Sequence, residues 1–314
     1  MDTTATSPET EPLSRLSLWL RALRLFSLPA VIVPVIVGAG LAARSATGVA
    51  NWWLLLWMAV SATAMLLAVN VRNDIDDFDR GLDRPGQPPG AAGSGVIPDG
   101  LLTRSDMLTA QFALMAVAGF AALPLIWERG LEVLVLGTAG FSLGLLYTAR
   151  PFGLKYRGLG DPLVFLLMGP VMVSGIDWIL TGELAAARIA AGAPVGLLAV
   201  LILHANNWRD VETDASAGIR TVAIRLGGKG SQIYAALLAA GALAIVAWAA
   251  LAGIVPALSL LVFLSLPKVS ATLRLIRQGR EAYRRRGPRG DPTFHAAQLH
   301  LLFGILYAAG LLFG

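Results

Sequence analysis

The chain has 314 residues, of which 56% are hydrophobic and only 14% are charged, and its net charge is +5. Soluble domains carry about 25% charged residues, so this composition excludes an ordinary soluble protein and predicts an all-α polytopic membrane protein. The absence of cysteine excludes disulfides, thiolate catalysis and cysteine-ligated metal sites. Basic loops at a membrane surface explain the positive charge better than nucleic-acid binding does, so no nucleic-acid partner is expected.

Nine apolar stretches are long enough to span a membrane. We expect them at residues 19–43, 52–71, 107–127, 131–149, 161–181, 189–208, 231–252, 254–273 and 294–313. Gly253 alone separates the seventh from the eighth, which predicts a tight helical hairpin. Residues 1–13 lack the basic segment of a signal peptide and are expected to form a disordered cytoplasmic tail, with residues 14–314 as one transmembrane domain.

The distribution of basic residues predicts the orientation. All Lys and Arg residues except Arg44, Arg129 and Arg188 lie at the amino end or follow spans two, four, six and eight. Basic segments stay on the inner side of a membrane. The amino terminus and the even-numbered exits are therefore expected in the cytoplasm, with Gly314 outside the cell inner (plasma) membrane.

An acidic segment follows the second span and runs from Asn73 to Asp83. On a continued helix, Asn73, Asp74 and Asp77 share one face through their spacing of three and four residues. Asp76 and Asp79 face elsewhere and are expected to be solvated. Carboxylate and amide oxygens suit Mg²⁺, which takes its remaining ligands from phosphate and water.

Residues 84–103 form a long loop beside this acidic segment, because closely spaced glycine and proline exclude a regular helix there. Loops of this length are commonly functional, and its position favours a lid. Ser105 is expected to cap the third span.

A second acidic segment, Asn206-Asn207-Trp208-Arg209-Asp210, follows the sixth span and continues to Asp214. Asp210 and Asp214 are four residues apart on one helix face. A single such segment could be a solvated helix end. Two of them on one membrane face favour a shared site for Mg²⁺ and a diphosphate, and their spacing indicates two four-helix halves plus a ninth helix.

Basic and polar residues near the same rim complete the candidate site. Lys155 and Arg157 follow the fourth span, and Arg209 and Arg220 flank the second acidic segment, where they could stabilise a departing diphosphate. Away from the rim, His204, His300 and Gln298 are interpreted as hydrogen-bonded core residues, and Asp177 is expected to reach solvent.

Several motifs resemble the UbiA superfamily of intramembrane prenyltransferases. Asn73-Asp74-x-x-Asp77 with Gly81-x-Asp83 is similar to its first aspartate-rich motif, and Asp210-x-x-x-Asp214 with Gly218-Ile219-Arg220-Thr221 is similar to its second. Within that superfamily the chain resembles the MenA-like 1,4-dihydroxy-2-naphthoate polyprenyltransferase branch. The stretches that carry this likeness are Asn206 to Asp210, Tyr147-Thr148 with Pro151-Phe152, Tyr156 to Asp161, Gly169-Pro170-Val171, and Leu299 to Gly304.

The resemblance implies a UbiA-like fold and a reaction. A polyprenyl diphosphate would react with an aromatic acceptor, most simply 1,4-dihydroxy-2-naphthoate with loss of its carboxylate, in menaquinone biosynthesis. Asn73, Asp77, Asp210 and Asp214 would hold Mg²⁺. The implied catalytic residues are Asp74, Asp77, Asp210, Asp214 and Tyr147; the implied substrate-binding residues are Asn73, Asp83, Lys155, Arg157, Asn206, Asn207, Arg209 and Arg220.

Departures from the branch leave the acceptor open. Asp161 stands where MenA-like proteins usually carry Glu, and Gly81 where many superfamily members carry Asp. Other acceptors of the superfamily are 4-hydroxybenzoate, haem, chlorophyllide, homogentisate and lipid-linked sugars. A CDP-alcohol phosphotransferase is disfavoured because its compact motif is absent. A secondary transporter is disfavoured because the carboxylates lie at one membrane face and not at the midplane.

Overall fold

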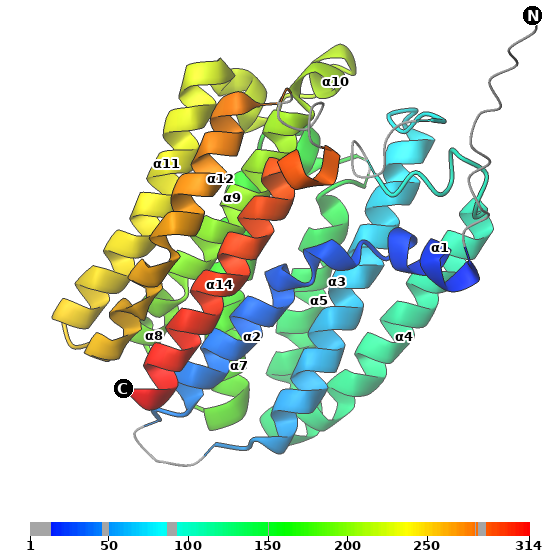
Figure 1. Cartoon of the computed structure of the whole chain (residues 1–314). Coiled ribbons are helices and arrows are strands. Elements are labelled where there is room, and N and C mark those ends of the chain that lie inside the picture. Colours follow the sequence, from blue (N-terminus) through cyan, green and yellow to red (C-terminus); the bar gives the residue numbers. More distant parts are fainter. Residues whose placement is uncertain (1–13, 46–49, 87–92, 150, 280, 282–286) are drawn as a thin grey trace, which may run out of the picture.

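The computed structural model describes residues 14–45, 50–86, 93–149, 151–279, 281 and 287–314, and every regular element in them is helical (Figure 1). The predicted tail, residues 1–13, lies outside these ranges. Eight segments are long and apolar enough to cross a membrane, and α5 is a shorter apolar helix between two of them. All nine predicted spans are therefore helical, which confirms an integral membrane protein of the all-α class.

The long elements, in chain order, are α2 (Pro29–Ala42), α3 (Trp53–Asp79), α4 (Arg104–Arg129), α5 (Leu131–Leu146), α6 (Gly160–Leu166) with α7 (Met172–Thr181), α9 (Ala193–Arg209), α11 (Val222–Leu251), η4 (Ala257–Ser265) with α12 (Leu266–Gln278), and α14 (Pro292–Phe313). The short elements are α1 (Arg15–Ala22), η1 (Leu25–Ser27), η2 (Leu154–Arg157), η3 (Leu167–Val171), α8 (Ala186–Ala191), α10 (Val211–Ser216) and η5 (Gly287–Gly290).

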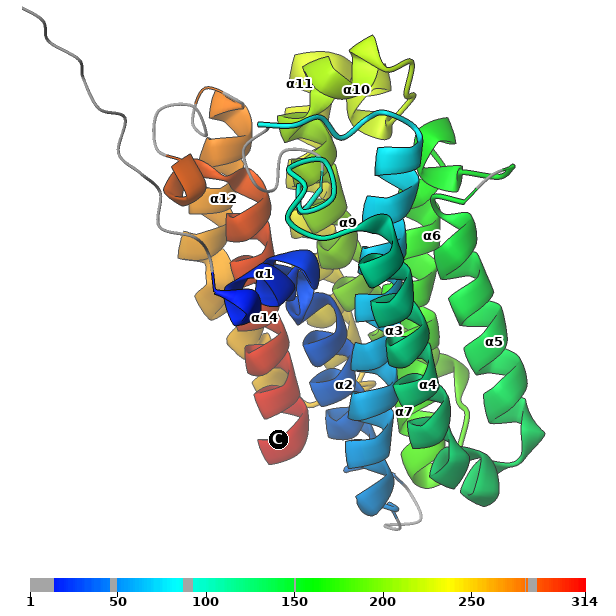
Figure 2. The same ribbon diagram turned by 90° about the vertical axis from the view of Figure 1, so that its right-hand side faces the viewer.

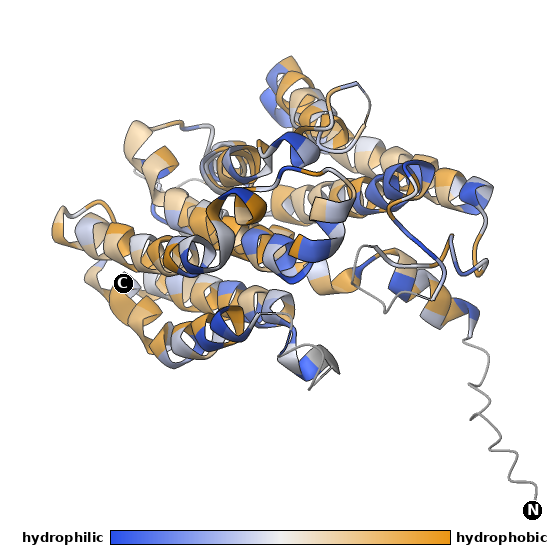
Figure 3. Ribbon diagram, turned by 90° about the horizontal axis from the view of Figure 1, so that it is seen from above, coloured by the Kyte–Doolittle hydropathy of each residue, from blue (hydrophilic) through white to orange (hydrophobic). Residues whose placement is uncertain are grey.

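The helices form the two predicted groups of four, closed by α14. In the first group α3 packs on α4, and α2 packs on α7 of the second group. In the second group α9 contacts α11, and α14 then packs against α2 and α9. The loop after α3 and the short helix α10 lie at the same end of the bundle (Figure 2). Seen from above, hydrophilic segments lie among the helix ends there (Figure 3).

The first predicted span, residues 19–43, is two helices and not one. Arg24 adopts a left-handed backbone conformation with φ of 54°, which separates α1 from η1 and α2. A non-glycine residue in this region costs on the order of 1 kcal/mol or more, so surrounding contacts must stabilise it. The Arg24 guanidinium supplies one, because it forms an ion pair with Asp74 on α3. The break therefore turns a basic side chain toward the acidic segment.

The cap of α4 also differs from expectation. Thr103, and not Ser105, is the capping residue: its hydroxyl accepts from the Asp106 backbone N–H, and the Asp106 carboxylate accepts from the Thr103 N–H. These two hydrogen bonds satisfy two backbone N–H groups at once. Ser105 could not form such a capping box, because no acidic residue stands three residues after it.

At the opposite end of the bundle, the prediction that Asp177 reaches solvent is wrong. Asp177 is only 1% exposed, and Arg188 Nη1 lies 2.8 Å from its carboxylate. Arg188 also forms an ion pair with Glu183. The loop after α7 thus folds back and replaces water around Asp177, so both charges are buried as a pair.

Small residues fix the position of α9. A Cβ added to Gly169 in η3 would lie 2.7 Å from the Gly196 Cα, so the two backbones meet directly. Such contacts are typical of helix pairs in membranes. Because α9 carries the second acidic segment at its end, this contact sets that segment beside α6 and the loop before it. The predicted hairpin between α11 and η4 is also confirmed, with Gly253 at φ of 69°.

Candidate active site

Asp74 lies at the centre of three elements that are distant in sequence. Arg24 Nη1 donates to Asp74 Oδ1 at 3.2 Å, and the Ser94 backbone N–H donates to Oδ2 at 3.2 Å. Ser94 belongs to the loop after α3, and its carbonyl accepts from Arg21 Nε. The carboxylate is therefore enclosed by the turn after α1 and by the described part of the predicted lid.

The described part of this loop packs tightly over α3. Val96 and Ile97 are buried against Ala22, Val71 and Ile75. A Cβ on Gly93 would lie 2.5 Å from Asp83 Oδ2 and 3.0 Å from Asp74 Oδ1. Only a glycine can pass between the two carboxylates at this distance, so the loop brings Asp83 next to Asp74.

Asp77 is paired with the loop that follows α5. Lys155 Nζ lies 2.9 Å from Asp77 Oδ2, and the Tyr156 hydroxyl donates to Asp77 Oδ1. Asp77 is only 2% exposed. Burial opposes the charged form of Lys155, but the negative charge of Asp77 prevails and holds the pKa of this amine above its usual value. A fixed ammonium group therefore stands beside the first acidic segment.

Asn73 and Asp76 both meet Thr148. The Thr148 hydroxyl lies 2.9 Å from Asn73 Oδ1 and 2.9 Å from Asp76 Oδ2. Asp76 also forms an ion pair with Arg72, one helical turn earlier. The prediction that Asp76 is solvated is therefore wrong, because the turn after α5 covers it. Asp79 is partly exposed and pairs with Arg104, so it stays outside the buried site as expected.

The second acidic segment is organised by Arg209, which is 4% exposed. Its Nε and Nη2 donate to both oxygens of Asp210, at 2.9 and 2.8 Å, and its Nη1 donates to Asp291 at 2.9 Å. Asn206 Oδ1 accepts from the same guanidinium. One buried cation thus joins the end of α9 to the start of α14.

The two acidic segments lie at the same end of the bundle. Burial is the main reason why the pKa of Asp214 is raised to about 7. The charges of Asp210 and of Asp77, on the other segment, raise this pKa as well, and the Lys155 ammonium lowers it. Lys155, which forms an ion pair with Asp77, and Asp77 itself therefore both influence a carboxyl group of the other segment.

The remaining predicted residues fall into two groups. Tyr147 and Asn207 lie at helix ends beside the site. Tyr147 directly follows α5, where a Cβ on Gly160 would touch its ring. Asn207 is near the end of α9 and is buried, with no partner for its Oδ1 among the described residues. Arg157 and Arg220 are exposed at the edge of the site. Arg157 donates to the Pro151 carbonyl, and the Arg220 backbone N–H donates to the Tyr156 carbonyl.

Sequence reasoning missed four residues of this site: Arg24, Ser94, Tyr156 and Asp291. Three of them carry no sequence signal, because each meets its carboxylate only through tertiary contact. Tyr156 could have been predicted from the sequence, because it is adjacent to Lys155 and begins the stretch Tyr156 to Asp161.

The core histidines differ from each other. His204 Nε2 lies 3.1 Å from the Ser231 carbonyl, as a hydrogen-bonded core residue should. His300 is fully buried, and neither of its ring nitrogens has a partner in the described ranges, so the prediction fails there. Gln298 accepts from Lys268 at the surface of α14.

A family model agrees with this geometry. The UbiA prenyltransferase family model matches residues 31–313, which is nearly the whole described chain. The chain belongs to the UbiA prenyltransferase family.

Two relatives of this prenyltransferase match 70% and 94% of its length. It is 29% identical over 298 residues to a 1,4-dihydroxy-2-naphthoate octaprenyltransferase of Mycobacterium leprae. The aligned part is 94% of this chain and 95% of the relative. A protein of the same name from Mycobacterium tuberculosis is 33% identical over 224 residues, covering 70% and 74%. Among solved structures, a UbiA homologue from Archaeoglobus fulgidus bound to DMAPP and Mg²⁺ has a TM-score of 0.60 at 17% identity, covering 93% and 99%. This last likeness shows the fold.

The donor atoms of the prenyltransferase fit Mg²⁺. Asp83 Oδ1 and Asn207 Oδ1 are buried hard oxygens that have no hydrogen-bond partner in the described part of the chain. No group of three His, Asp or Glu residues there is placed to hold a metal by itself. The two unpartnered oxygens suit Mg²⁺, which takes one or two carboxylates and completes its shell with phosphate oxygens and water.

The pKa values of the rim predict how stability depends on pH. Burial, with the charges of Asp77 and Asp74, raises the pKa of Asp83 to about 7, against an ordinary value of 3.8. The folded protein then binds more protons than the unfolded chain between these values, so the stabilising effect of protonation is lost as pH rises through about 7. In chelator, Asp83→Asn is expected to melt at a higher temperature than the wild-type prenyltransferase near pH 8, and this difference should shrink as the pH falls through 7 and disappear below about 4.

Thermal unfolding in detergent across this range measures the difference. Asp79→Asn serves as the control, because Asp79 lies at the same helix end but is partly exposed and paired with Arg104. A constant difference between Asp83→Asn and wild type at all pH values would contradict the prediction.

Proposed function

We propose that this prenyltransferase transfers a polyprenyl group from a polyprenyl diphosphate to 1,4-dihydroxy-2-naphthoate, with loss of the acceptor's carboxylate. The observation that carries the proposal is that two buried acidic segments lie at the same end of the bundle, with Lys155 paired to the first and Arg209 to the second. The acceptor is supported by the names of the mycobacterial relatives, one of which matches almost the whole chain. The use of Mg²⁺ is supported by the donor atoms and by the homologue bound to Mg²⁺.

Each residue group has a distinct part in this proposal. Asn73, Asp77, Asp210 and Asp214 would hold Mg²⁺, which when bound neutralises the charge that develops on the departing diphosphate. Lys155 can bind phosphate oxygens, because its ammonium group is held beside Asp77 and its side chain is still 16% exposed. Asp74 and Asp83 support the first segment, and the loop at Gly93 and Ser94 excludes water from them.

The acceptor ring would meet the allylic carbon close to Tyr147. Tyr147 comes directly after α5 and packs against Gly160 at the start of α6. Its ring can stabilise the developing allylic cation through its π face. As the C–O bond to the diphosphate breaks, the electron-rich acceptor forms the new C–C bond, and the lost carboxylate leaves as CO₂.

Membranes that contain the protein test the proposal. They are offered a labelled prenyl diphosphate, Mg²⁺ and separate aromatic acids, and the products are identified by mass spectrometry. We expect a prenylated, decarboxylated naphthol. Labelling of 4-hydroxybenzoate, homogentisate or another acceptor would reject the naphthoate, and uptake of the substrate without any product would indicate a transporter.

We also propose that the amino terminus and the rim of the site face the cytoplasm, with Gly314 outside the inner membrane. The distribution of Lys and Arg supports this orientation. Because the chain has no cysteine, single cysteines report on accessibility directly. A cysteine at Ser216 should react with an impermeant maleimide in inverted vesicles and be protected in intact cells. The opposite pattern would reverse the orientation.

A further inference from the structure

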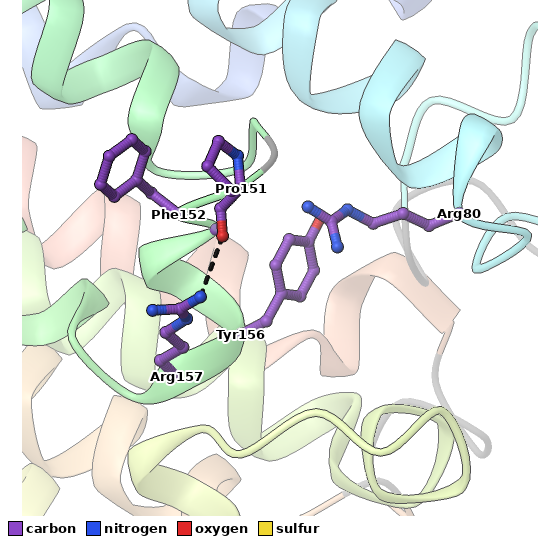
Figure 4. A pocket seen from close by; sticks show the side chains of 6 residues that line it. Arg80, Pro151, Phe152, Tyr156 and Arg157 are labelled. Atoms are coloured by element: carbon purple, nitrogen blue, oxygen red, sulfur yellow. Dashed lines mark hydrogen bonds between the residues drawn. The ribbon is translucent and has the colours of Figure 1, made fainter.

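A pocket of about 380 Å³ lies beside the active site, at the end of α5 (Figure 4). Its lining residues are Arg80, Pro151, Phe152, Gly153, Tyr156 and Arg157. Asp77 does not line it; the Tyr156 side chain stands between Asp77 and the pocket, with its hydroxyl on the carboxylate and its ring facing Arg80. A ligand in the pocket therefore touches the wall of the active site and not the reacting groups.

The pocket carries unneutralised positive charge. Arg80 Nη2 donates to the Thr148 carbonyl at 2.7 Å, and Arg157 Nη2 donates to the Pro151 carbonyl at 2.9 Å. Neither guanidinium forms an ion pair with a carboxylate in the described ranges. Arg72 and Arg104, at the same end of the bundle, are both ion-paired. Each pocket arginine thus keeps several N–H donors for an anion, and guanidinium groups suit phosphate oxygens.

The surroundings of the pocket are apolar and face outward. Phe152, which lines the pocket, and Leu159, two residues after Arg157, are each 49% exposed. The pocket follows the end of α5, whose first half is exposed at Leu134, Val135 and Leu136 and whose second half is mostly half-buried. A molecule that has both an acyl chain and a phosphate can lie along α5 and reach the pocket with its charged end.

We propose that this pocket binds the phosphate group of an anionic membrane lipid. A free phosphate could use the same donors, but it would leave Phe152, Leu159 and the face of α5 uncovered. Each basic residue at the edge of a bilayer strengthens the binding of anionic lipid by roughly fivefold. The pocket has two such residues, Arg80 and Arg157. The proposal does not depend on the identity of the aromatic acceptor.

The bound lipid would be linked to the active site through Arg80. The Arg80 Cζ lies 4.2 Å from the centre of the Tyr156 ring, a cation–π contact. An anion that holds the edge of this guanidinium also holds its face on the ring, and so keeps the Tyr156 hydroxyl on Asp77. Gly153 leaves the space that this stack needs, because a Cβ there would lie 2.8 Å from the Tyr156 ring and 3.2 Å from Arg80 Nη2. Anionic lipid is therefore expected to favour prenyl transfer.

The test uses the full chain in nanodiscs of equal parts phosphatidylglycerol and phosphatidylcholine. Lipids that stay bound are identified by native mass spectrometry. We expect wild-type protein to retain phosphatidylglycerol preferentially, and Arg80→Gln with Arg157→Gln to lower this preference about tenfold or more. Arg104→Gln is the matched control, because it removes one positive charge at the same membrane end but outside the pocket. Arg157→Gln alone gives the same test, with a smaller loss, if the double variant does not fold.

Two further measurements test whether the phosphate belongs to a lipid and whether the pocket is coupled to Asp77. Inorganic phosphate or diphosphate that displaces the retained lipid at the pocket would overturn the lipid assignment in favour of a soluble anion. Prenyl transfer by wild type should fall in nanodiscs that contain phosphatidylcholine only, whereas the double variant should be insensitive to this change. Equal loss of phosphatidylglycerol in Arg104→Gln, or an unchanged preference in the double variant, would overturn the proposal.

Discussion

Replacing Asp77 or Asp210 by alanine is expected to lower the rate of Mg²⁺-dependent prenyl transfer by about a thousandfold or more. Each carboxylate belongs to one of the two acidic segments, and each is already fixed by a cation, Lys155 for Asp77 and Arg209 for Asp210. Removing Asp77 would take away a proposed Mg²⁺ ligand and the ion-pair partner of Lys155. Removing Asp210 would take away another proposed ligand and leave Arg209 paired with Asp291 alone. Initial rates in membranes, followed over a range of Mg²⁺ concentrations, measure the loss.

Asp79→Ala is the matched control for this experiment. Asp79 lies half a turn beyond Asp77 on α3, but its carboxylate is partly exposed and pairs with Arg104 at the surface. It should keep most of the wild-type rate. Full activity in both Asp77→Ala and Asp210→Ala would remove these residues from the site, whereas an equal loss in Asp79→Ala would point to general disruption of the helix end.

Arg209→Ala is expected to destabilise the protein by about 3–5 kcal/mol, enough to lower its yield in the membrane sharply. Arg209 is buried and pairs with Asp210 and Asp291 at once, so its removal leaves two carboxylates near each other without a counter-charge. Thermal unfolding of the purified protein in detergent measures the effect. Arg220→Ala is the control, because Arg220 is exposed and contributes only its backbone N–H to the described contacts.

This prediction separates two roles for Arg209. The contacts of Arg209 indicate that it positions Asp210. In that case Arg209→Ala should lose thermal stability, and any loss of diphosphate binding should accompany that loss of stability. Phosphate binding by Arg209, which the motif implies, stays a prediction. A well-folded Arg209→Ala variant with a raised KM for the prenyl diphosphate alone would favour that role over the structural one.

The sequence is most informative where helical periodicity and membrane topology decide the structure. The i, i+3 and i, i+4 spacing at Asn73, Asp74 and Asp77 is enough to place them together, because α3 continues unbroken past the apolar span. The alternation of loops that are rich and poor in Lys and Arg is enough to place both acidic segments at one end of the bundle. Both inferences depend only on local geometry and on the cost of burying charge.

Sequence reasoning is least informative where tertiary contact overrides a local preference. The left-handed Arg24 breaks an otherwise continuous apolar stretch, and only its ion pair with Asp74 explains why. Asp76 and Asp177 look solvated from their positions, but Thr148 and Arg188 cover them from segments 72 and 11 residues away. No periodic pattern encodes such contacts.

The length of α5 has a consequence for the membrane itself. Its 16 residues span about 24 Å, whereas the hydrocarbon core of a bilayer is about 30 Å thick. Hydrophobic mismatch of this kind is relieved by thinning of the bilayer around the short helix. The membrane would therefore be thinnest on the side of α5, and its polar surface would dip toward the turn at Thr148. Such a dip would bring lipid headgroups closer to Thr148, which contacts Asn73 and Asp76 of the first acidic segment.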